Sequence, residues 1–281
     1  MAIFQVNFMA DTLKRTVPIH VILPTDKVYF PGMPRREAGK PYKTLYLMHG
    51  VLGSDIDWLY GTRIQRWAED RDLAVVMCSG ENGFYVDQPW NCSMYGEFVG
   101  KELVEFTRKT FPLSHKKEDT YIGGLSMGGY GAIRNGLKYN DTFGAVVALS
   151  SALVVNKELP HIVENAMYFV ETAEYKHSCF GPDLEAAVKS DMNPKVIVEQ
   201  MLNEEKVFPK IYMACGNLDS LLVYNQEFSD FLSIKNIEHT FEIGEGSHEW
   251  DFWDTYLLRA LEWLPLESKE QGMGSGNIGL T

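Results

Sequence analysis

The sequence of 281 residues has few cysteines and a deficit of basic residues. Its four cysteines are scattered without CxxC spacing, which favours buried, reduced thiols over disulfides at Cys78, Cys92, Cys179 and Cys215. Only 26 Lys and Arg oppose 38 Asp and Glu, so the formal net charge is −12, and the acids are spread along the chain. A field of this sign repels polyanions. We therefore expect no nucleic acid partner.

Long apolar runs and motifs for sorting or cofactor binding are also lacking. No apolar stretch approaches the length needed to cross a bilayer, and Met1 to Asp11 has neither the basic nor the apolar region of a signal peptide. We expect no membrane contact and a cytoplasmic location, although a chain already cleaved from its signal peptide would look the same. There is no HExxH motif, no Cys/His cluster and no P-loop ending in GKS or GKT. We expect neither a metal nor a cofactor.

The order of apolar runs predicts an α/β fold. Two alternating segments, Ile3 to Phe8 and Val17 to Leu23, are typical of antiparallel strands. After them, short apolar runs alternate with helical patterns, as in a parallel sheet with crossover helices. The expected parallel strands are Thr44 to Met48, Leu73 to Met77, Tyr121 to Gly123, Ala145 to Leu149, Ile211 to Ala214 and Thr240 to Ile243. The expected helices include Thr62 to Asp70, Tyr95 to Thr110 and Tyr130 to Lys138. This pattern predicts a mostly parallel central sheet flanked by helices.

The domain organisation is predicted from length and composition. With 45% hydrophobic residues, no Pro/Gly/Ser-rich linker and no internal repeat, residues 1–270 are expected to form one domain. The segment 152–206 is too long for a plain loop, and its pattern is helical at Pro160 to Thr172 and Pro194 to Asn203. We interpret it as a helical cap insertion that helps to form a pocket. The glycine-rich residues 271–281 are expected to be a disordered tail.

A candidate nucleophile lies in the motif Gly124-Leu125-Ser126-Met127-Gly128, which matches G-x-S-x-G. The motif follows an apolar strand and opens a helix, as a strand–turn–helix elbow requires. Side chains at Gly124 or Gly128 would collide with the neighbouring strand or helix, so the glycines allow the strained turn that exposes Ser126. The helix N-terminus adds partial positive charge where an oxyanion would form. The competing interpretation is a glycine-rich turn with a structural serine.

A serine hydroxyl needs a neighbouring base, and one of the seven histidines fits that role by position. His248 lies just after the Thr240 strand, in a turn-rich loop, Gly244 to Trp250, that leads into a helix. It therefore stands at the same sheet edge as Ser126 and follows it in the chain. The histidines that we exclude lie in strands, a charged turn or the cap segment, namely His20, His115, His161, His177 and His239.

The acid that would orient the histidine has two customary places, each after a strand that follows the nucleophile. The first place reads Ser150-Ser151-Ala152 and has no carboxylate, whereas the second, after the Ile211 strand, ends at Asp219. Asp219 is expected to accept the proton of His248 Nδ1 and to stabilise the imidazolium. The rival carboxylates next to the histidine, which we expect to be solvated, are Glu245, Glu249 and Asp251.

An oxyanion hole would need two backbone N–H groups. Met127, immediately after the nucleophile, is expected to give one, and Val51 in the loop His49 to Ser54 the other. His49 is either a pocket residue or a buried, hydrogen-bonded turn histidine. The aromatic loop Asn82 to Tyr95 lies at the same edge and would line a pocket or pack internally, with Phe84, Tyr85, Trp90 and Tyr95 as the candidates.

Four blocks together resemble the esterase D-like group, which includes tributyrin esterases, S-formylglutathione hydrolases and feruloyl or acetyl-xylan esterases of carbohydrate esterase family 1. They are LMHGVLGSDIDW at Leu47 to Trp58, GGLSMGGYGA at Gly123 to Ala132, CGNLDSLL at Cys215 to Leu222 and GSHEWDFW at Gly246 to Trp253. The resemblance spans roughly Ile3 to Leu264, and it implies the α/β-hydrolase fold and its catalytic triad. His49-Gly50 stands where formylglutathione enzymes usually have Ser-Gly, and their cysteine-bearing oxyanion loop is missing. The chain is therefore more similar to the tributyrin and feruloyl esterases.

These observations predict a serine carboxylesterase acting through an acyl-enzyme. Its substrates are expected to be short-chain acyl or hydroxycinnamoyl (feruloyl) esters, with plant-derived sugars and oligosaccharides as one class of alcohol. The alternatives are a thioesterase of the S-formylglutathione hydrolase type, an acyltransferase of the same fold, and an inactive protein that only binds a ligand. By analogy with related esterases, we expect a homo-oligomer.

Overall fold

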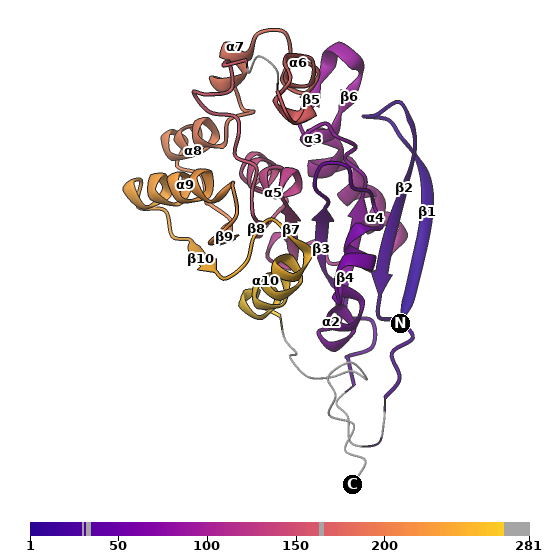
Figure 1. The fold of residues 1–281 in the computed structure, drawn as a ribbon. Helices are drawn as coiled ribbons and strands as arrows, with labels where there is room; N and C mark the ends of the chain where they lie inside the picture. The colour runs from indigo at the N-terminus through magenta and orange to yellow at the C-terminus, as the bar shows by residue number, and fades with distance from the viewer. Residues whose placement is uncertain (30, 32–34, 163–165, 267–281) are drawn as a thin grey trace.

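A computed structural model describes residues 1–29, 31, 35–162 and 166–266. Within them, the strands of the main sheet are Ala2–Ala10 (β1), Arg15–Leu23 (β2), Lys43–Met48 (β3), Leu73–Cys78 (β4), Thr120–Leu125 (β7), Ala145–Leu149 (β8), Lys210–Gly216 (β9) and Thr240–Gly244 (β10). Their order is β1-β2-β4-β3-β7-β8-β9-β10 (Figure 1). The pairs β1–β2 and β2–β4 are antiparallel, and all pairs from β4 to β10 are parallel. A separate antiparallel hairpin joins Asp87–Gln88 (β5) to Ser93–Met94 (β6).

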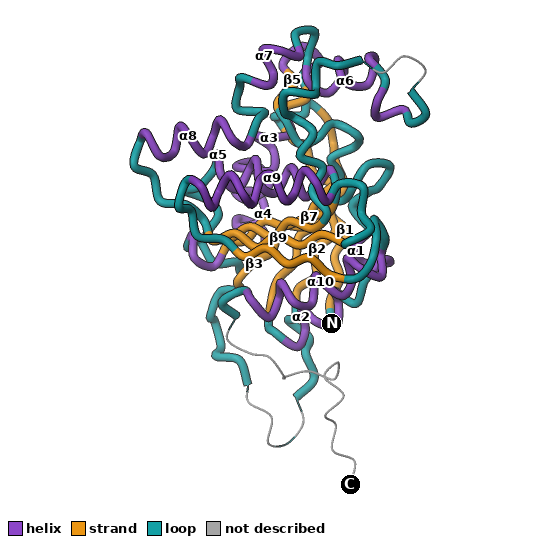
Figure 2. The backbone as a smooth tube through the Cα atoms, turned by 60° about the vertical axis from the view of Figure 1, so that its left-hand side comes forward, coloured by secondary structure: helices purple, strands orange, loops and turns teal. Residues whose placement is uncertain are grey.

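Helices cover both faces of this sheet. The helices are Asp57–Gly61 (α1), Ile64–Asp70 (α2), Tyr95–Glu97 (α3), Leu103–Thr110 (α4), Met127–Lys138 (α5), Ala173–Phe180 (α6), Leu184–Val188 (α7), Pro194–Asn203 (α8), Leu222–Ile234 (α9) and Trp250–Trp263 (α10). A π-helical turn, Phe98–Glu102, joins α3 to α4. Figure 2 shows α5, α8 and α9 on one side of the sheet and α2 and α10 on the other. No helix in the described ranges is long and apolar enough to cross a membrane.

The central strands are apolar along their length because both of their faces are covered. Every residue of β4, β7 and β8 is buried. Alternate residues enter two separate cores, so that Tyr46 and Ile122 pack on the α5 side while Leu45 and Tyr121 pack on the α10 side. The predicted central sheet flanked by helices is therefore confirmed.

Several of the expected helices differ in extent from the structure. Helix α5 begins at Met127, three residues before the predicted start at Tyr130, and α2 begins at Ile64, two residues after the predicted start at Thr62. In the segment 152–206, the prediction of Pro194 to Asn203 is confirmed by α8, but the described residues of Pro160 to Thr172 form only a short 3₁₀ helix, Phe169–Glu171. The side chain of Thr172 accepts a hydrogen bond from Tyr175 N–H and so caps α6, which starts the helix after the predicted span. The predicted tail, 271–281, lies outside the described residues.

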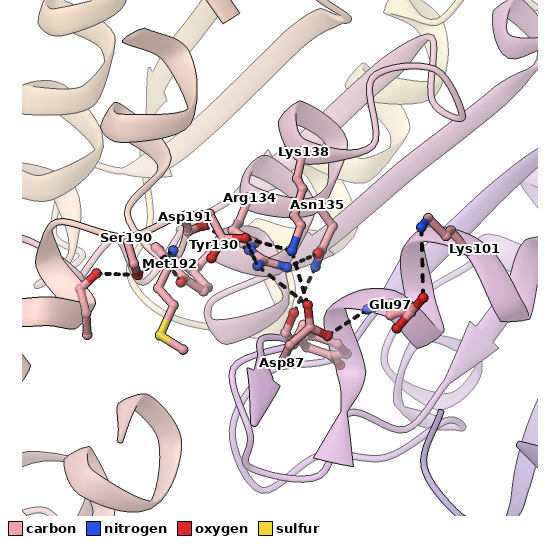
Figure 3. Close-up of polar contacts among 12 residues, drawn as sticks. Asp87, Glu97, Lys101, Tyr130, Arg134, Asn135, Lys138, Ser190, Asp191 and Met192 are labelled. Carbon is pink, nitrogen blue, oxygen red and sulfur yellow. Dashed lines mark hydrogen bonds and ion pairs between the residues drawn. The ribbon is translucent and has the colours of Figure 1, made fainter. Parts of the chain in front are cut away.

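A buried ionic cluster holds parts of this segment and of the β5–β6 hairpin against α5. The guanidinium of Arg134 lies 2.9 Å from Asp191 and 3.8 Å from Asp87, and only 1% of its side chain is exposed (Figure 3). Lys138, one turn further along α5, lies 2.6 Å from Asp191 and 3.2 Å from Asp87. Both α6 and α7 lie beside the hairpin at one end of the molecule (Figure 1).

Candidate active site

The chain turns sharply between β7 and α5, with Ser126 at the turn. Ser126 has a positive φ of 56°, a strained conformation for a residue other than glycine. Close packing forces glycine at two places, because a Cβ atom on Gly124 would collide with the Gly128 carbonyl, and one on Gly128 with the Met48 carbonyl. The turn sets Ser126 at the carboxyl edge of the sheet, with 8% of the residue exposed.

Two loops from distant parts of the chain bring a histidine and an aspartate to this serine. His248 Nε2 lies 3.0 Å from Ser126 Oγ, and His248 Nδ1 lies 2.9 Å from Asp219 Oδ2. Asp219 follows β9 by a tight turn, and His248 follows β10, the parallel neighbour of β9. The sequence-predicted base and acid therefore meet the predicted nucleophile in one hydrogen-bonded line. The rival carboxylates Glu245, Glu249 and Asp251 are all exposed.

The surroundings of Asp219 keep its carboxylate ionised. Burial acts to raise its pKa, but hydrogen bonds from His248 and from the backbone N–H of Leu221, together with other polar contacts, hold the pKa below its ordinary value. The Leu221 N–H donates to Asp219 Oδ1 at 2.8 Å, which leaves Oδ2 for the histidine. An ionised carboxylate in this place favours the Nδ1–H tautomer of His248, whose Nε2 can then accept the serine proton.

The loop after β3 passes close to Ser126. A Cβ atom on Gly50 would lie 2.7 Å from Leu125 Cδ1 and 3.3 Å from Ser126 Cβ, so any larger residue here would require the Leu125 side chain to shift. The next residue, Val51, has a backbone N–H without a hydrogen-bond acceptor in the described part of the chain. Met127 is the first residue of α5, and the first N–H groups of a helix have no partner within it. Two backbone donors are thus available near the serine.

Metal chemistry has no evident ligand set here. Across the described ranges, no group of three or more His, Cys, Asp or Glu side chains could hold a metal ion. The hydrogen-bonded line of serine, histidine and aspartate instead has the parts needed for nucleophilic acyl transfer.

Comparisons with known proteins agree with this chemistry. The sequence model of the family described as "Putative esterase" matches residues 10–264. The chain belongs to this esterase family. The esterase is 44% identical over 271 residues to the acetyl esterase of Caldicellulosiruptor saccharolyticus, in an alignment that covers 94% of this chain and 98% of the relative.

Two solved structures from Staphylococcus aureus extend the comparison to three dimensions. They are the fluorophosphonate-binding serine hydrolase FphF and the S-formylglutathione hydrolase FrmB, each 30% identical to the esterase with a TM-score of 0.79. Each match covers 94% of the esterase and 98% of the solved chain. The esterase therefore has the α/β-hydrolase fold and is a carboxylic ester hydrolase of the esterase D-like group, as the sequence predicted.

Four of the expected pocket residues lie inside the core of the esterase, and one of these, Phe84, is 4% exposed. His49 is fully buried, with Nδ1 2.6 Å from the Gly50 carbonyl and Nε2 accepting from Gly80 N–H at 2.9 Å. Burial lowers its pKa, so a neutral ring braces the loop. The hydroxyl of Tyr85, also fully buried, donates to the His49 carbonyl at 3.1 Å. The interpretation of His49 and Tyr85 as pocket residues is therefore wrong, because neither presents surface to a ligand.

The other two aromatic candidates differ from each other. Tyr95 is 1% exposed and its hydroxyl accepts a hydrogen bond from Arg15, so its expected pocket role is also wrong. Trp90 is 46% exposed, and its ring lies against Gly181 at the end of α6. Its role as a pocket residue stays a prediction.

Contacts around the site also involve residues that the sequence did not single out. Asn225 of α9 braces the strand end after β8, since its side chain accepts from Ser151 N–H at 3.1 Å and donates to the Ser151 carbonyl at 2.9 Å. Asn82 contacts the loop after β3. Ser150 and Trp253 lie behind the aspartate and the histidine. Trp253 belongs to the sequence block around His248, and this block was the signal that could have identified it. Ser150 lies in the segment after β8, which was considered from the sequence only as a place for the acid.

Proposed function

We propose that the esterase is a serine carboxylesterase with Ser126 as nucleophile, His248 as general base and Asp219 as the orienting acid. The supporting observation is the continuous pair of hydrogen bonds from Ser126 Oγ through the imidazole to Asp219, at 3.0 and 2.9 Å. A base within hydrogen-bond reach of the hydroxyl, itself oriented by a third group, is the geometry that activates a serine.

In the acylation step, Ser126 Oγ attacks the ester carbonyl while its proton passes to His248 Nε2. The carbonyl oxygen becomes an oxyanion that the N–H groups of Val51 and Met127 stabilise, helped by the N-terminus of α5. The imidazolium then donates its proton to the leaving alcohol, and an acyl-Ser126 ester remains. In deacylation, water attacks this ester, gives a proton to His248 and releases the acid as the serine regains its hydrogen.

A short acyl group is the best supported substrate feature. Two relatives with 30% identity or more, an acetyl esterase and an S-formylglutathione hydrolase, are named after acyl groups of two carbons and one carbon. A hydroxycinnamoyl group would need an aromatic-lined pocket, and two of the proposed lining rings, Tyr85 and Tyr95, are buried in the core. We therefore favour acetyl esters, with sugars or oligosaccharides as the proposed alcohols.

A thioesterase that hydrolyses S-formylglutathione is the second candidate. It is favoured by the 30% identity to FrmB over nearly the whole chain. The same acyl-enzyme would form from a thioester, with glutathione leaving as the thiol in place of an alcohol.

We also propose that residues 1–270 act as one domain in which the segment 152–206 caps the site. This segment starts beside the nucleophile, because Ala152 N–H donates to the Ser126 carbonyl at 2.9 Å. Its helix α6 reaches the opposite side of the site through Tyr175, whose hydroxyl donates to the Asn82 carbonyl at 2.8 Å. The four cysteines are free thiols, three of them buried, whereas Cys92 is exposed and not buried as the sequence predicted. Free thiols suit the proposed cytoplasmic location.

The test is a set of kcat/KM values for acetyl, butyryl and feruloyl oxygen esters and for S-formylglutathione, measured with the wild type and Ser126→Ala. We expect the highest value for an acetyl ester and at least a 10³-fold loss in the variant with every substrate. A preference for S-formylglutathione would select the second candidate, and a preference for feruloyl esters would contradict the short acyl pocket. Full activity of a pure Ser126→Ala preparation would overturn the mechanism itself.

A further inference from the structure

Ser150 lies directly after β8, which is the first of the two customary places for the orienting acid in this fold. It is fully buried and has a positive φ of 46°. Its backbone N–H donates to the Ala214 carbonyl of β9 at 2.7 Å, which fixes it next to the strand that leads to Asp219. The side chain is therefore held at a defined place on the acid's side of the site.

The hydroxyl of Ser150 has a donor on one side and acceptors on the other. Trp253 Nε1–H of α10 donates to Ser150 Oγ at 3.1 Å, in a contact closed to solvent. With that lone pair occupied, the hydroxyl can donate its hydrogen elsewhere, and the Ser150 side chain is one of the polar groups that lower the pKa of the Asp219 carboxyl. Burial raises the pKa of the neighbouring Cys215 thiol to about 12, so this group faces Asp219 in its neutral form.

Trp253 also packs against the base. The rings of Trp253 and His248 are perpendicular, at 89°, with centroids 4.9 Å apart. Trp253 is 6% exposed, and Trp250 packs on its other side with ring centroids 5.2 Å apart. The imidazole, by contrast, is 35% exposed and could rotate away from Ser126 without this support.

We propose that Ser150 and Trp253 are positioning residues for the catalytic base and acid. Together with His248 and Asp219 they form a closed ring of contacts, in which Trp253 touches the base directly and reaches the acid through the Ser150 hydroxyl. This inference rests on the proposed function of Asp219 and His248. The ring serves two ends: it fixes the imidazole plane, and it moderates the negative charge of the carboxylate that faces His248.

The experiment compares Ser150→Gly, Trp253→Phe and the double variant with the wild type. Glycine suits the positive φ of position 150, so the change removes the hydroxyl without adding backbone strain. Phenylalanine keeps a ring against His248 but removes the N–H. Trp263→Phe is the matched control, because Trp263 lies on the same helix and packs on Tyr212, away from the triad.

For Ser150→Gly we expect kcat to fall about tenfold, as for one charge-assisted hydrogen bond, with KM within about twofold. A fall in kcat with KM nearly unchanged is a result that a general loss of structure would not cause. Since Trp253 N–H acts on the acid through Ser150, Trp253→Phe should cost less, and the double variant no more than Ser150→Gly alone.

Two results would overturn the inference while Ser126→Ala still abolished activity. One is a Ser150→Gly variant with wild-type kcat and wild-type KM. The other is fully additive losses in the double variant, which would mean that the two side chains act separately. Thermal unfolding of each variant and of Trp263→Phe shows whether a loss of activity comes from a loss of fold.

Discussion

The side-chain oxygen of Asn82 accepts a hydrogen bond from the backbone N–H of Leu52, at 2.8 Å. Leu52 has a positive φ of 66° and directly follows Val51, the proposed oxyanion donor. The backbone carbonyl of the same asparagine accepts from the Tyr175 hydroxyl at 2.8 Å and from the Cys179 thiol at 3.2 Å, both on α6. Asn82 thus joins the proposed oxyanion loop to the proposed cap.

From this contact we predict that Asn82→Ala lowers kcat about tenfold with KM nearly unchanged, because a misplaced donor weakens binding of the transition state more than of the substrate. Affinity for a trifluoromethyl ketone, which mimics the tetrahedral oxyanion, should fall by a similar factor. Tyr175→Phe is the matched control, since it breaks only the bond to the Asn82 carbonyl. If Asn82→Ala left the ketone affinity unchanged, the loop would not depend on this side chain.

Replacement of the proposed acid tests its role in the reaction. We predict that Asp219→Asn lowers kcat by about 10⁴-fold, because an amide cannot stabilise the imidazolium and favours the wrong histidine tautomer. The control is Glu249→Gln, which alters an exposed carboxylate beside His248 and retains an oxygen for the Ser247 N–H. Comparable losses in both variants would show that Asp219 has no special place among these acids.

The same carboxylate gives a prediction for stability against acid. The pKa of Asp219 is lower in the folded protein than its ordinary value of 3.8. Its stabilising contribution is therefore complete above that value and is lost as the pH falls through the folded pKa. We expect the wild type to exceed Asp219→Asn in free energy of unfolding at pH 6, and the difference to shrink as the pH drops below about 4. Urea unfolding across this range measures it, and a difference independent of pH would contradict the sign.

The sequence predicted the parts of the fold and of the site that depend on local patterns. The central strands from Thr44 to Ala214 appeared as apolar runs because both faces of a parallel sheet are buried there. Ser126 was predicted from its G-x-S-x-G motif, and Asp219 and His248 from the order of strand ends, which meet at one sheet edge. The sequence left open whether Tyr85 and Tyr95 are buried, because an aromatic loop looks the same whether its rings face a pocket or the core.

The contacts of the segment 152–206 were likewise invisible in the sequence. The start of α6 depends on a cap at Thr172, and the position of Asp191 depends on a guanidinium 57 residues earlier in the chain. Ser150 was passed over because its part depends on Trp253, about a hundred residues later. Such pairings depend on tertiary structure, and the hydrophobic period of a helix or strand does not reveal them.

The buried Arg134 leads to a prediction about stability. Its loss would leave Lys138 and the Glu97 N–H beside the carboxylates of Asp87 and Asp191, and Asp191 is 39% exposed. We therefore expect Arg134→Met to lower the free energy of unfolding by about 3 kcal/mol. Lys101→Met, which removes an exposed ion pair of 3.8 Å with Glu97, should cost less than about 1 kcal/mol (Figure 3). Urea unfolding of the two variants provides the comparison. Equal small effects would mean that Lys138 and solvent replace the guanidinium.

The tightest backbone contact of the elbow offers the last prediction. A Cβ atom on Gly128 would collide with the Met48 carbonyl and lie 2.6 Å from the His49 carbonyl, both part of backbone that cannot rotate away. Gly128→Ala must therefore push α5 away from β3 and displace the N–H of Met127 from the serine. We expect a loss of about 2 kcal/mol or more in unfolding free energy. The loss of kcat should be at least about 100-fold, as for removal of an oxyanion donor. Gly83→Ala is the control, because its added Cβ would meet nothing closer than 3.4 Å. A folded Gly128→Ala protein with normal kcat would show that the spacing between β3 and α5 does not set the geometry of this site.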